Sequence, residues 1–226
     1  YQKRFNFGQT TGIDLPGEAA GILQDESNIT DSALATNSFG QNFTSTMVQI
    51  ASAYCSLING GNYYRPHMVK QILDEDGTVV KTFDAEVVRQ TVSNDTSEFL
   101  KNALYMTMTE GTANQARVEG YEMGGKTGTA QKLPRDAGRY IISLISHAPA
   151  DNPELMLYVV IDDPQVEEEL QGDSVFVKDL TREIMADLMP YFNIYPTEVV
   201  ETQPEETQPE TDENGNPVET QPETDE

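Results

Sequence analysis

Apolar residues recur every three to four positions in three segments of the chain, which is the spacing of a helix that buries one face. We therefore expect helices at 44–59 before Gly60, at 95–110 before Gly111, and at 175–189 before Pro190. The apolar positions that define them are Met47, Ile50, Ala51, Tyr54, Leu57 and Ile58, then Phe99, Leu100, Ala103 and Leu104, and last Val177, Leu180, Ile184 and Leu188. Asp95 and Glu98 are the expected capping pair of the second helix.

Strands are expected between the second and third helices. Residues 139–148 and 155–163 are rich in β-branched and aromatic side chains, and the turn-forming segment PADNPE joins them. So short a connection makes the two strands antiparallel neighbours. A further strand is expected at 126–132, and a smaller hairpin at 68–92 that turns at Asp76-Gly77. Helices with antiparallel strands predict an α+β fold.

The composition divides the chain into two parts. Residues 197–226 contain eleven acidic and no basic residues, and the sequence ETQPE occurs there three times. A segment so rich in Glu, Thr, Gln and Pro cannot bury enough apolar surface to offset its chain entropy. We therefore expect a folded body at 1–196 and a disordered acidic tail at 197–226, which would act as a solubilising spacer.

Charge and metal-ligating residues exclude several classes of function. The net charge is −24 for the whole chain and −13 for residues 1–196, where all 14 basic residues lie. Such a surface does not suit nucleic acid or anionic lipid as a partner. Cys55 is the only cysteine and there are two histidines, so the chain has neither an internal disulfide nor paired ligands for zinc. We expect no metal and no cofactor, and no apolar run reaches the length of a membrane span.

The stretch GYEMGGKTGTAQK fits the phosphate-loop pattern G-x-x-x-x-G-K-T, with Gly120, Gly125, Lys126 and Thr127 in register. A phosphate loop needs a buried strand before it and a helix after it, because N–H groups at the helix start hold the phosphates. Here a polar segment precedes the motif, and glycines and a proline downstream would break the helix. These features disfavour an NTPase, although LMLYVVIDD at 155–163 has the apolar-then-acidic pattern of a nucleotide-binding strand.

The same stretch carries Lys126-Thr127-Gly128-Thr129 in the expected strand at 126–132. The two glycines before it permit close approach of the backbone. A lysine flanked by hydroxyls on an exposed strand attracts a carboxylate. Free backbone groups of such a strand can pair with an extended peptide. This pattern favours a site for a peptide that ends in a carboxylate.

Four segments, in this order, resemble the transpeptidase domain of the monofunctional penicillin-binding proteins. They are FNFGQTTGIDLPGE at 5–18, SFGQNFTSTMVQIASAYCSLINGGNYYRPHMV at 38–69, GTANQARVEGYEMGGKTGTAQK at 111–132 and HAPADNPELMLYVVIDDP at 147–164. The resemblance covers about residues 1–192 and is to the C-terminal half of that domain. It implies a partial penicillin-binding or serine β-lactamase-like fold, in which helices pack on an antiparallel sheet. The family usually has Gly where Asn42 stands and Pro where Met47 or Val48 stands.

The resemblance also implies a reaction and roles for four residues. In the family a serine attacks the D-Ala-D-Ala end of a peptidoglycan stem peptide, releases D-Ala and passes the acyl group to an amine of a neighbouring peptide; β-lactams acylate the same serine. Lys126 would supply positive potential and help to move a proton. Thr127 and Thr129 would bind the carboxylate of the peptide or β-lactam, and Gly128 would keep the strand face clear. The Thr129 N–H would be one of two oxyanion-hole donors.

The serine itself is missing from the chain. No serine has Lys three residues later or Asn two residues later, so the Ser-x-x-Lys and Ser-x-Asn motifs are absent. In the family both motifs precede the segment that FNFGQTTGID resembles. We therefore expect a C-terminal piece of a longer protein, inactive and unstable alone, whose partner is the missing N-terminal part. A membrane anchor in that part would hold the protein at the extracytoplasmic face of the bacterial membrane. A non-catalytic peptidoglycan-binding module is the alternative interpretation.

Other residues with chemical potential are expected to be structural. No histidine is spaced to activate Cys55, which lies beside an apolar stripe and is expected to pack. The remaining residues expected to serve the fold are His67, His147, Asp162 and Asp163 at loops and strand ends, and Met106, Met108, Met185 and Met189 as core fillers.

Overall fold

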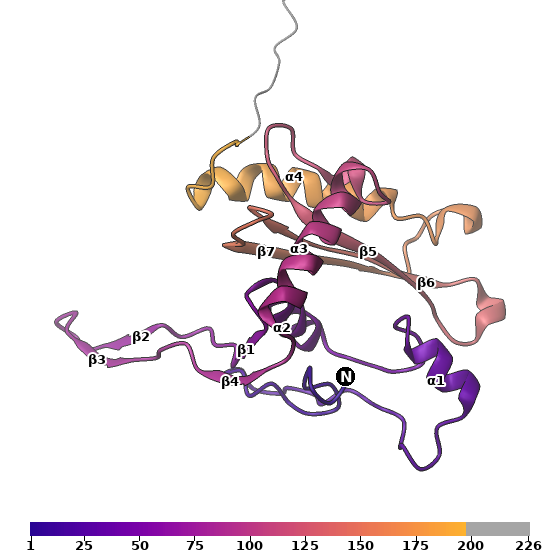
Figure 1. Ribbon diagram of the computed structural model, residues 1–226, viewed down its shortest axis with the longest axis horizontal. Helices are drawn as coiled ribbons and strands as arrows, with labels where there is room; N and C mark the ends of the chain where they lie inside the picture. The colour runs from indigo at the N-terminus through magenta and orange to yellow at the C-terminus, as the bar shows by residue number, and fades with distance from the viewer. Residues whose placement is uncertain (198–226) are drawn as a thin grey trace, which may run out of the picture.

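The computed structural model describes residues 1–197 (Figure 1). The helices in this part are α1 (Asp31–Asn37), α2 (Met47–Ile58), α3 (Asn94–Thr109) and α4 (Val175–Tyr191). The strands are β1 (Asn62–Tyr64), β2 (Gln71–Leu73), β3 (Val79–Thr82), β4 (Val87–Gln90), β5 (Gly124–Gln131), β6 (Tyr140–Ala148) and β7 (Leu155–Asp162). Short 3₁₀ turns lie at Asn114–Ala116, Arg135–Ala137 and Glu168–Leu170. The α+β fold is confirmed, whereas the acidic tail lies outside the described residues apart from Thr197, so its disorder and its boundary stay predictions.

The main sheet has the order β5-β6-β7, and both strand pairs are antiparallel, as the short connection between β6 and β7 predicted. Helix α4 lies on one side of this sheet and α2 on the other, while α3 crosses beside β5 (Figure 1). Because successive side chains of a strand point to opposite faces of the sheet, each strand contributes to the packing on both sides. Ile142 and Leu144 of β6 face the α4 side, and Ile145 joins Tyr54 and Ile58 of α2 on the opposite side.

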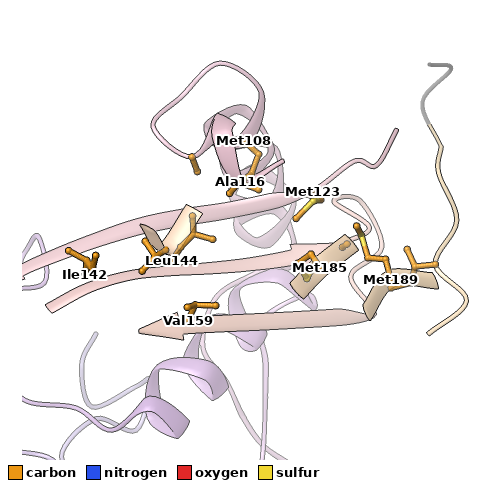
Figure 2. Packing of buried hydrophobic residues seen from close by; sticks show 12 residues of the cluster. Met108, Ala116, Met123, Ile142, Leu144, Val159, Met185 and Met189 are labelled. Atoms are coloured by element: carbon orange, nitrogen blue, oxygen red, sulfur yellow. The ribbon is translucent and has the colours of Figure 1, made fainter. Parts of the chain in front are cut away.

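The larger apolar cluster lies between the sheet and α4, and the end of α3 closes it (Figure 2). The buried side chains of α4 are Val177, Thr181, Met185 and Met189, which recur every four residues. Three of the predicted core residues, Leu180, Ile184 and Leu188, each lie one residue before a buried position. Leu180 is therefore at the edge of the buried side and is 39% exposed. The expected core roles of Met108, Met185 and Met189 are confirmed, but that of Met106 is wrong because its side chain is 55% exposed.

Two details of the expected helices are wrong at their ends. Ser93, not Asp95, caps α3: its hydroxyl accepts a hydrogen bond from the Thr96 N–H at 3.2 Å. Glu98 instead pairs with Lys101 at 3.0 Å. Helix α4 continues through Pro190 to Tyr191, because a proline in the last turn removes only one backbone hydrogen bond.

Part of the predicted apolar face of α3 is also wrong. The Phe99 ring is 71% exposed instead of packed against the body. Leu104 does pack, next to the cluster that Tyr54 and Ile145 form. The apolar spacing of α3 therefore located the helix and three half-buried positions, Leu100, Ala103 and Leu104, but it was wrong at Phe99.

The departures from the family pattern at Asn42 and Met47 have local explanations. Asn42 adopts φ +65°, a left-handed conformation that suits Gly and that Asn tolerates better than most residues. Met47 is the first residue of α2, the position that favours Pro in helices generally. The helix start is secured instead by Thr46 and Gln49, whose side chains each bond the other residue's backbone N–H.

The expected hairpin at 68–92 consists of β2 and β3, which pair around the Asp76-Gly77 turn with Gly77 at φ +81°. Strands β1 and β4 pair at its base, and the hairpin extends away from the rest of the chain (Figure 1). Asp14 anchors this base: its carboxylate accepts hydrogen bonds from the N–H groups of Met68 at 2.7 Å and Val69 at 3.0 Å. These bonds lower the pKa of Asp14.

Candidate active-site strand

Strand β5 lies at the edge of the sheet, since within residues 1–197 only β6 pairs with it. Just beyond the strand, the N–H of Lys132 donates to the carbonyl of Arg139 at 2.8 Å, in register with the β5–β6 pairs. Even-numbered residues of β5 therefore direct their backbone groups toward β6, because the two orientations alternate in an antiparallel pair. The N–H and C=O groups of Thr127 and Thr129 accordingly point away from the sheet, where a ligand can reach them.

The four predicted site residues lie along this edge but not on one face. Lys126 and Gly128 share the face that looks toward α2, and Thr127 and Thr129 share the opposite one. The exposed Lys126 ammonium donates to the Thr127 carbonyl at 2.8 Å. A side chain at Gly128 would collide with Ser143 of β6, because its Cβ would lie 2.7 Å from the Ser143 Oγ. A side chain at position 128 would therefore require the Ser143 hydroxyl to move.

Helix α3 and the loop after it cover the start of β5. The Thr107 hydroxyl donates to the Gly125 carbonyl, and the Thr112 and Thr127 hydroxyl oxygens lie 3.2 Å apart. A Cβ at Gly125 would lie 3.1 Å from the Met108 sulfur. A Cβ there would also lie 2.8 Å from the Ile145 carbonyl oxygen of β6, so glycine permits the close approach of backbone that the sequence predicted.

A loop between α1 and α2 contacts the other end of the site. The side-chain amide of Gln41 donates to the Thr129 carbonyl at 3.4 Å. Sequence reasoning missed Gln41, Thr107 and Thr112 as neighbours of the strand. Gln41 and Thr112 lie in segments that carry the family resemblance, but nothing in their spacing indicates which backbone groups they bond.

A buried histidine supports β5 from β6. The Tyr54 hydroxyl donates to Nδ1 of His147 at 2.7 Å, and Nε2 lies 3.4 Å from the Ala150 carbonyl. Since a carbonyl only accepts, Nε2 carries the proton of a neutral ring. Burial lowers the pKa of His147 to about 4. His147 is therefore a structural residue, as expected.

The remaining reactive groups form no second site among the described residues. Burial raises the pKa of the Cys55 thiol, which disfavours the nucleophilic thiolate. Within residues 1–197 no three His, Cys, Asp or Glu side chains gather as metal ligands would. None of the helices described there combines the length and apolar character needed to span a bilayer.

The phosphate-loop interpretation is wrong. Lys126 and Thr127 lie inside the continuous strand β5, whereas that motif places them at the start of a helix. The segment that follows is a turn and then β6. The strand LMLYVVIDD is antiparallel to its neighbour, not part of a parallel nucleotide-binding sheet.

The comparisons with known proteins decide the family. The model of the penicillin-binding protein transpeptidase domain matches residues 1–186. The chain belongs to this family. Stage V sporulation protein D of Bacillus subtilis is 39% identical over 202 residues, which cover 87% of this chain and 31% of that protein. The peptidoglycan D,D-transpeptidase FtsI of Escherichia coli is 34% identical over 168 residues, 72% of this chain and 26% of that protein.

Solved structures of penicillin-binding proteins have the same fold. Penicillin-binding protein 3 of Mycobacterium tuberculosis in complex with ampicillin has a TM-score of 0.76 and 28% identity, over 88% of this chain and 46% of that one. Penicillin-binding protein 3 of Burkholderia pseudomallei has a TM-score of 0.72 and 25% identity, over 88% of this chain and 58% of that one. The chain spans 31% and 27% of the length of the first two curated relatives it matches.

Proposed function

We propose that this chain is the C-terminal part of a peptidoglycan D,D-transpeptidase, and that β5 holds the carboxylate end of a stem peptide or β-lactam. The observation that carries the proposal is the exposed edge of β5, where Thr127 and Thr129 direct backbone groups outward beside the Lys126 ammonium. An extended peptide can pair with such an edge, and a carboxylate is attracted to its lysine and hydroxyls.

Each residue of the motif has a role in this proposal. Lys126 supplies positive potential and helps to move the proton of the attacking serine. Thr127 and Thr129 bind the substrate carboxylate through their hydroxyls, and the outward N–H of Thr129 donates to the oxyanion of the tetrahedral intermediate. Gly128 leaves room for the ligand. The serine attacks the carbonyl of D-Ala-D-Ala, D-Ala leaves, and an amine of a second stem peptide takes the acyl group.

The serine must come from a preceding part of the same protein, because no serine of this chain stands in the family's motifs. The outer edge of β7 supports this proposal. Within residues 1–197 no strand pairs with that edge, so its outward backbone N–H and C=O groups have no strand partner there. Further strands of the same domain would pair with such an edge. In this proposal the domain acts outside the bacterial cytoplasm, and an anchor preceding residue 1 ties it to the membrane.

Two relatives bear on the choice of substrate and ligand. FtsI of Escherichia coli is named a peptidoglycan D,D-transpeptidase, and the Mycobacterium tuberculosis structure holds ampicillin. We transfer these properties here as part of the proposal. The alternative is a peptidoglycan-binding module without catalysis. It predicts that the protein binds the ligand but forms no acyl-enzyme.

The test starts with the coding DNA upstream of Tyr1, where we expect Ser-x-x-Lys and then Ser-x-Asn in frame. The complete product is then incubated with ampicillin and its intact mass is measured. We expect one acyl adduct per protein, on a serine outside residues 1–226, and no adduct on residues 1–226 expressed alone. An adduct on a serine within this chain, or no adduct on the complete product, would contradict the proposal.

Substitution tests the strand itself. We expect Lys126→Ala to slow acylation by about 100-fold or more, the usual size of a proton-transfer contribution. Lys132→Ala is the matched control, since Lys132 lies just beyond β5 and pairs with Asp162 at 2.5 Å instead of facing the site. Equal acylation rates for Lys126→Ala and Lys132→Ala would remove Lys126 from the mechanism.

A further inference from the structure

The outward carbonyl groups of β5 are already occupied by side chains of this chain. Three of them accept such hydrogen bonds: the carbonyls of Gly125, Thr127 and Thr129, from Thr107, Lys126 and Gln41 respectively. A peptide that adds to a strand edge uses these same carbonyls as acceptors for its own N–H groups. Any peptide must therefore displace a side chain at each carbonyl that it uses.

The three bonds differ in how easily they can be displaced. Thr107 belongs to α3, whose neighbouring Met108 is fully buried in the main core, so the contact with Gly125 is fixed. Lys126 can release the Thr127 carbonyl by rotating a long side chain. Gln41 lies in the loop between α1 and α2, and its bond to Thr129 is long and exposed. The edge open to a ligand therefore begins at Thr127.

Gln41 differs from the other two donors in its chemistry. Its side chain presents an amide N–H to the Thr129 carbonyl, which is the group that a peptide backbone would present there. Within residues 1–197 this carbonyl is the sole hydrogen-bond partner of the Gln41 side chain. Gln41 thus imitates one hydrogen bond of a ligand without holding a place in the core.

We propose that Gln41 is a specificity-determining residue that competes with the amide N–H of a peptide or acylamino β-lactam for the Thr129 carbonyl. The inference rests on the proposed function of β5. A ligand with an amide N–H at this position replaces the Gln41 hydrogen bond with its own. The exchange of one hydrogen bond for another adds little to the free energy of binding. A ligand without that N–H leaves the Gln41 bond in place. Gln41 therefore reduces the advantage of peptide-like ligands over ligands that lack the amide.

The experiment compares variants of the complete product. Gln41→Met keeps the length of the side chain and removes its donor. Since one exposed hydrogen bond changes an equilibrium by roughly two- to tenfold, we expect the half-saturating concentration for acylation by ampicillin to fall by that factor. The maximal acylation rate should stay unchanged. A carbapenem, whose ring carries no acylamino group, should acylate Gln41→Met and the parent protein alike.

Asn42→Gly is the matched control, because Asn42 is in the same loop, has φ +65°, and bonds Thr36 instead of β5. It should behave as the parent with both ligands. An unchanged or raised half-saturating concentration for ampicillin in Gln41→Met would overturn the inference while leaving the transpeptidase proposal intact. Slower acylation by both ligands would also overturn it, because Gln41 would then only support the loop. Failure of the parent protein to be acylated would remove both proposals.

Discussion

The buried His147 ring makes part of the stability of this sheet dependent on pH. Its side chain is fully buried, and its neutral form already uses both nitrogens, with Tyr54 donating to one and Ala150 accepting from the other. Protonation would place a charge in a buried site, and the nearby Lys101 charge also disfavours the protonated ring. The folded state therefore resists a proton that the unfolded chain accepts readily.

The sign and size follow from the two pKa values. The folded-state pKa of about 4 lies below the unfolded value of 6.5. Between these values the unfolded state binds more protons, so the stabilisation is complete above pH 6.5 and is lost as the pH falls toward 4. From pH 7.5 to pH 5 the loss is about 2 kcal/mol, equivalent to roughly 30-fold in the opening equilibrium, with a limit of about 3 kcal/mol at lower pH.

Hydrogen exchange followed by mass spectrometry on peptides from β6 of the complete protein measures this loss, after correction for the intrinsic pH dependence of exchange. We expect the protection of β6 amides to fall by roughly 30-fold between pH 7.5 and 5. It should fall much less in His147→Asn, because the Asn side chain does not titrate. His67→Asn removes the chain's other histidine from an exposed loop and should keep the parent behaviour. Equal pH dependence in the parent and His147→Asn would refute the reasoning.

Four further substitutions, one of them a control, test the packing around the site, each by urea unfolding of the complete protein. Gly124→Ala places a Cβ 2.6 Å from Nε2 of His147 and should cost about 1–3 kcal/mol through overpacking. Gln49→Leu removes the partner of three backbone groups near the start of α2 and should cost about 3 kcal/mol or more, because each unsatisfied group costs about 1–3 kcal/mol. Met185→Ala should cost about 2–5 kcal/mol by leaving a cavity, whereas the exposed Met106→Ala should stay within about 0.5 kcal/mol. Equal costs for the two methionines would contradict the assigned core.

The sequence predicted the elements with strong local signals. The three long helices, the strand pair at 139–163 and the Asp76-Gly77 turn follow from apolar spacing and turn chemistry, which act over a few residues. The errors concern which side chains are buried, because packing between distant segments determines burial. Phe99 has the spacing of a core residue, but the surface that would cover it is absent from the described chain. Leu180 lies one residue before the buried Thr181 of α4, and Met106 lies two residues before the buried Met108 of α3.

At the candidate site, too, local features were predictable from the sequence and contacts between distant residues were not. The motif that begins at Lys126 was recognisable because its residue types and their order are local and specific. That Thr127 and Thr129 face outward follows from the β5–β6 register, which the motif itself does not contain. The contact between Gln41 and Thr129 joins residues 88 positions apart, and no periodicity reports such a pair.

The glycines of the motif explain why the phosphate-loop pattern was misleading. Gly125 is required because a Cβ there would lie 2.8 Å from the Ile145 carbonyl oxygen of the neighbouring strand. Gly120 has φ +82°, a left-handed conformation that glycine adopts without strain in the turn before β5. Both requirements come from the way the chain enters a tightly packed antiparallel sheet. A phosphate loop requires glycine for a different reason, to let backbone N–H groups surround a phosphate. Two unrelated constraints on the backbone thus produce the same short pattern, and only the packing around each glycine distinguishes them.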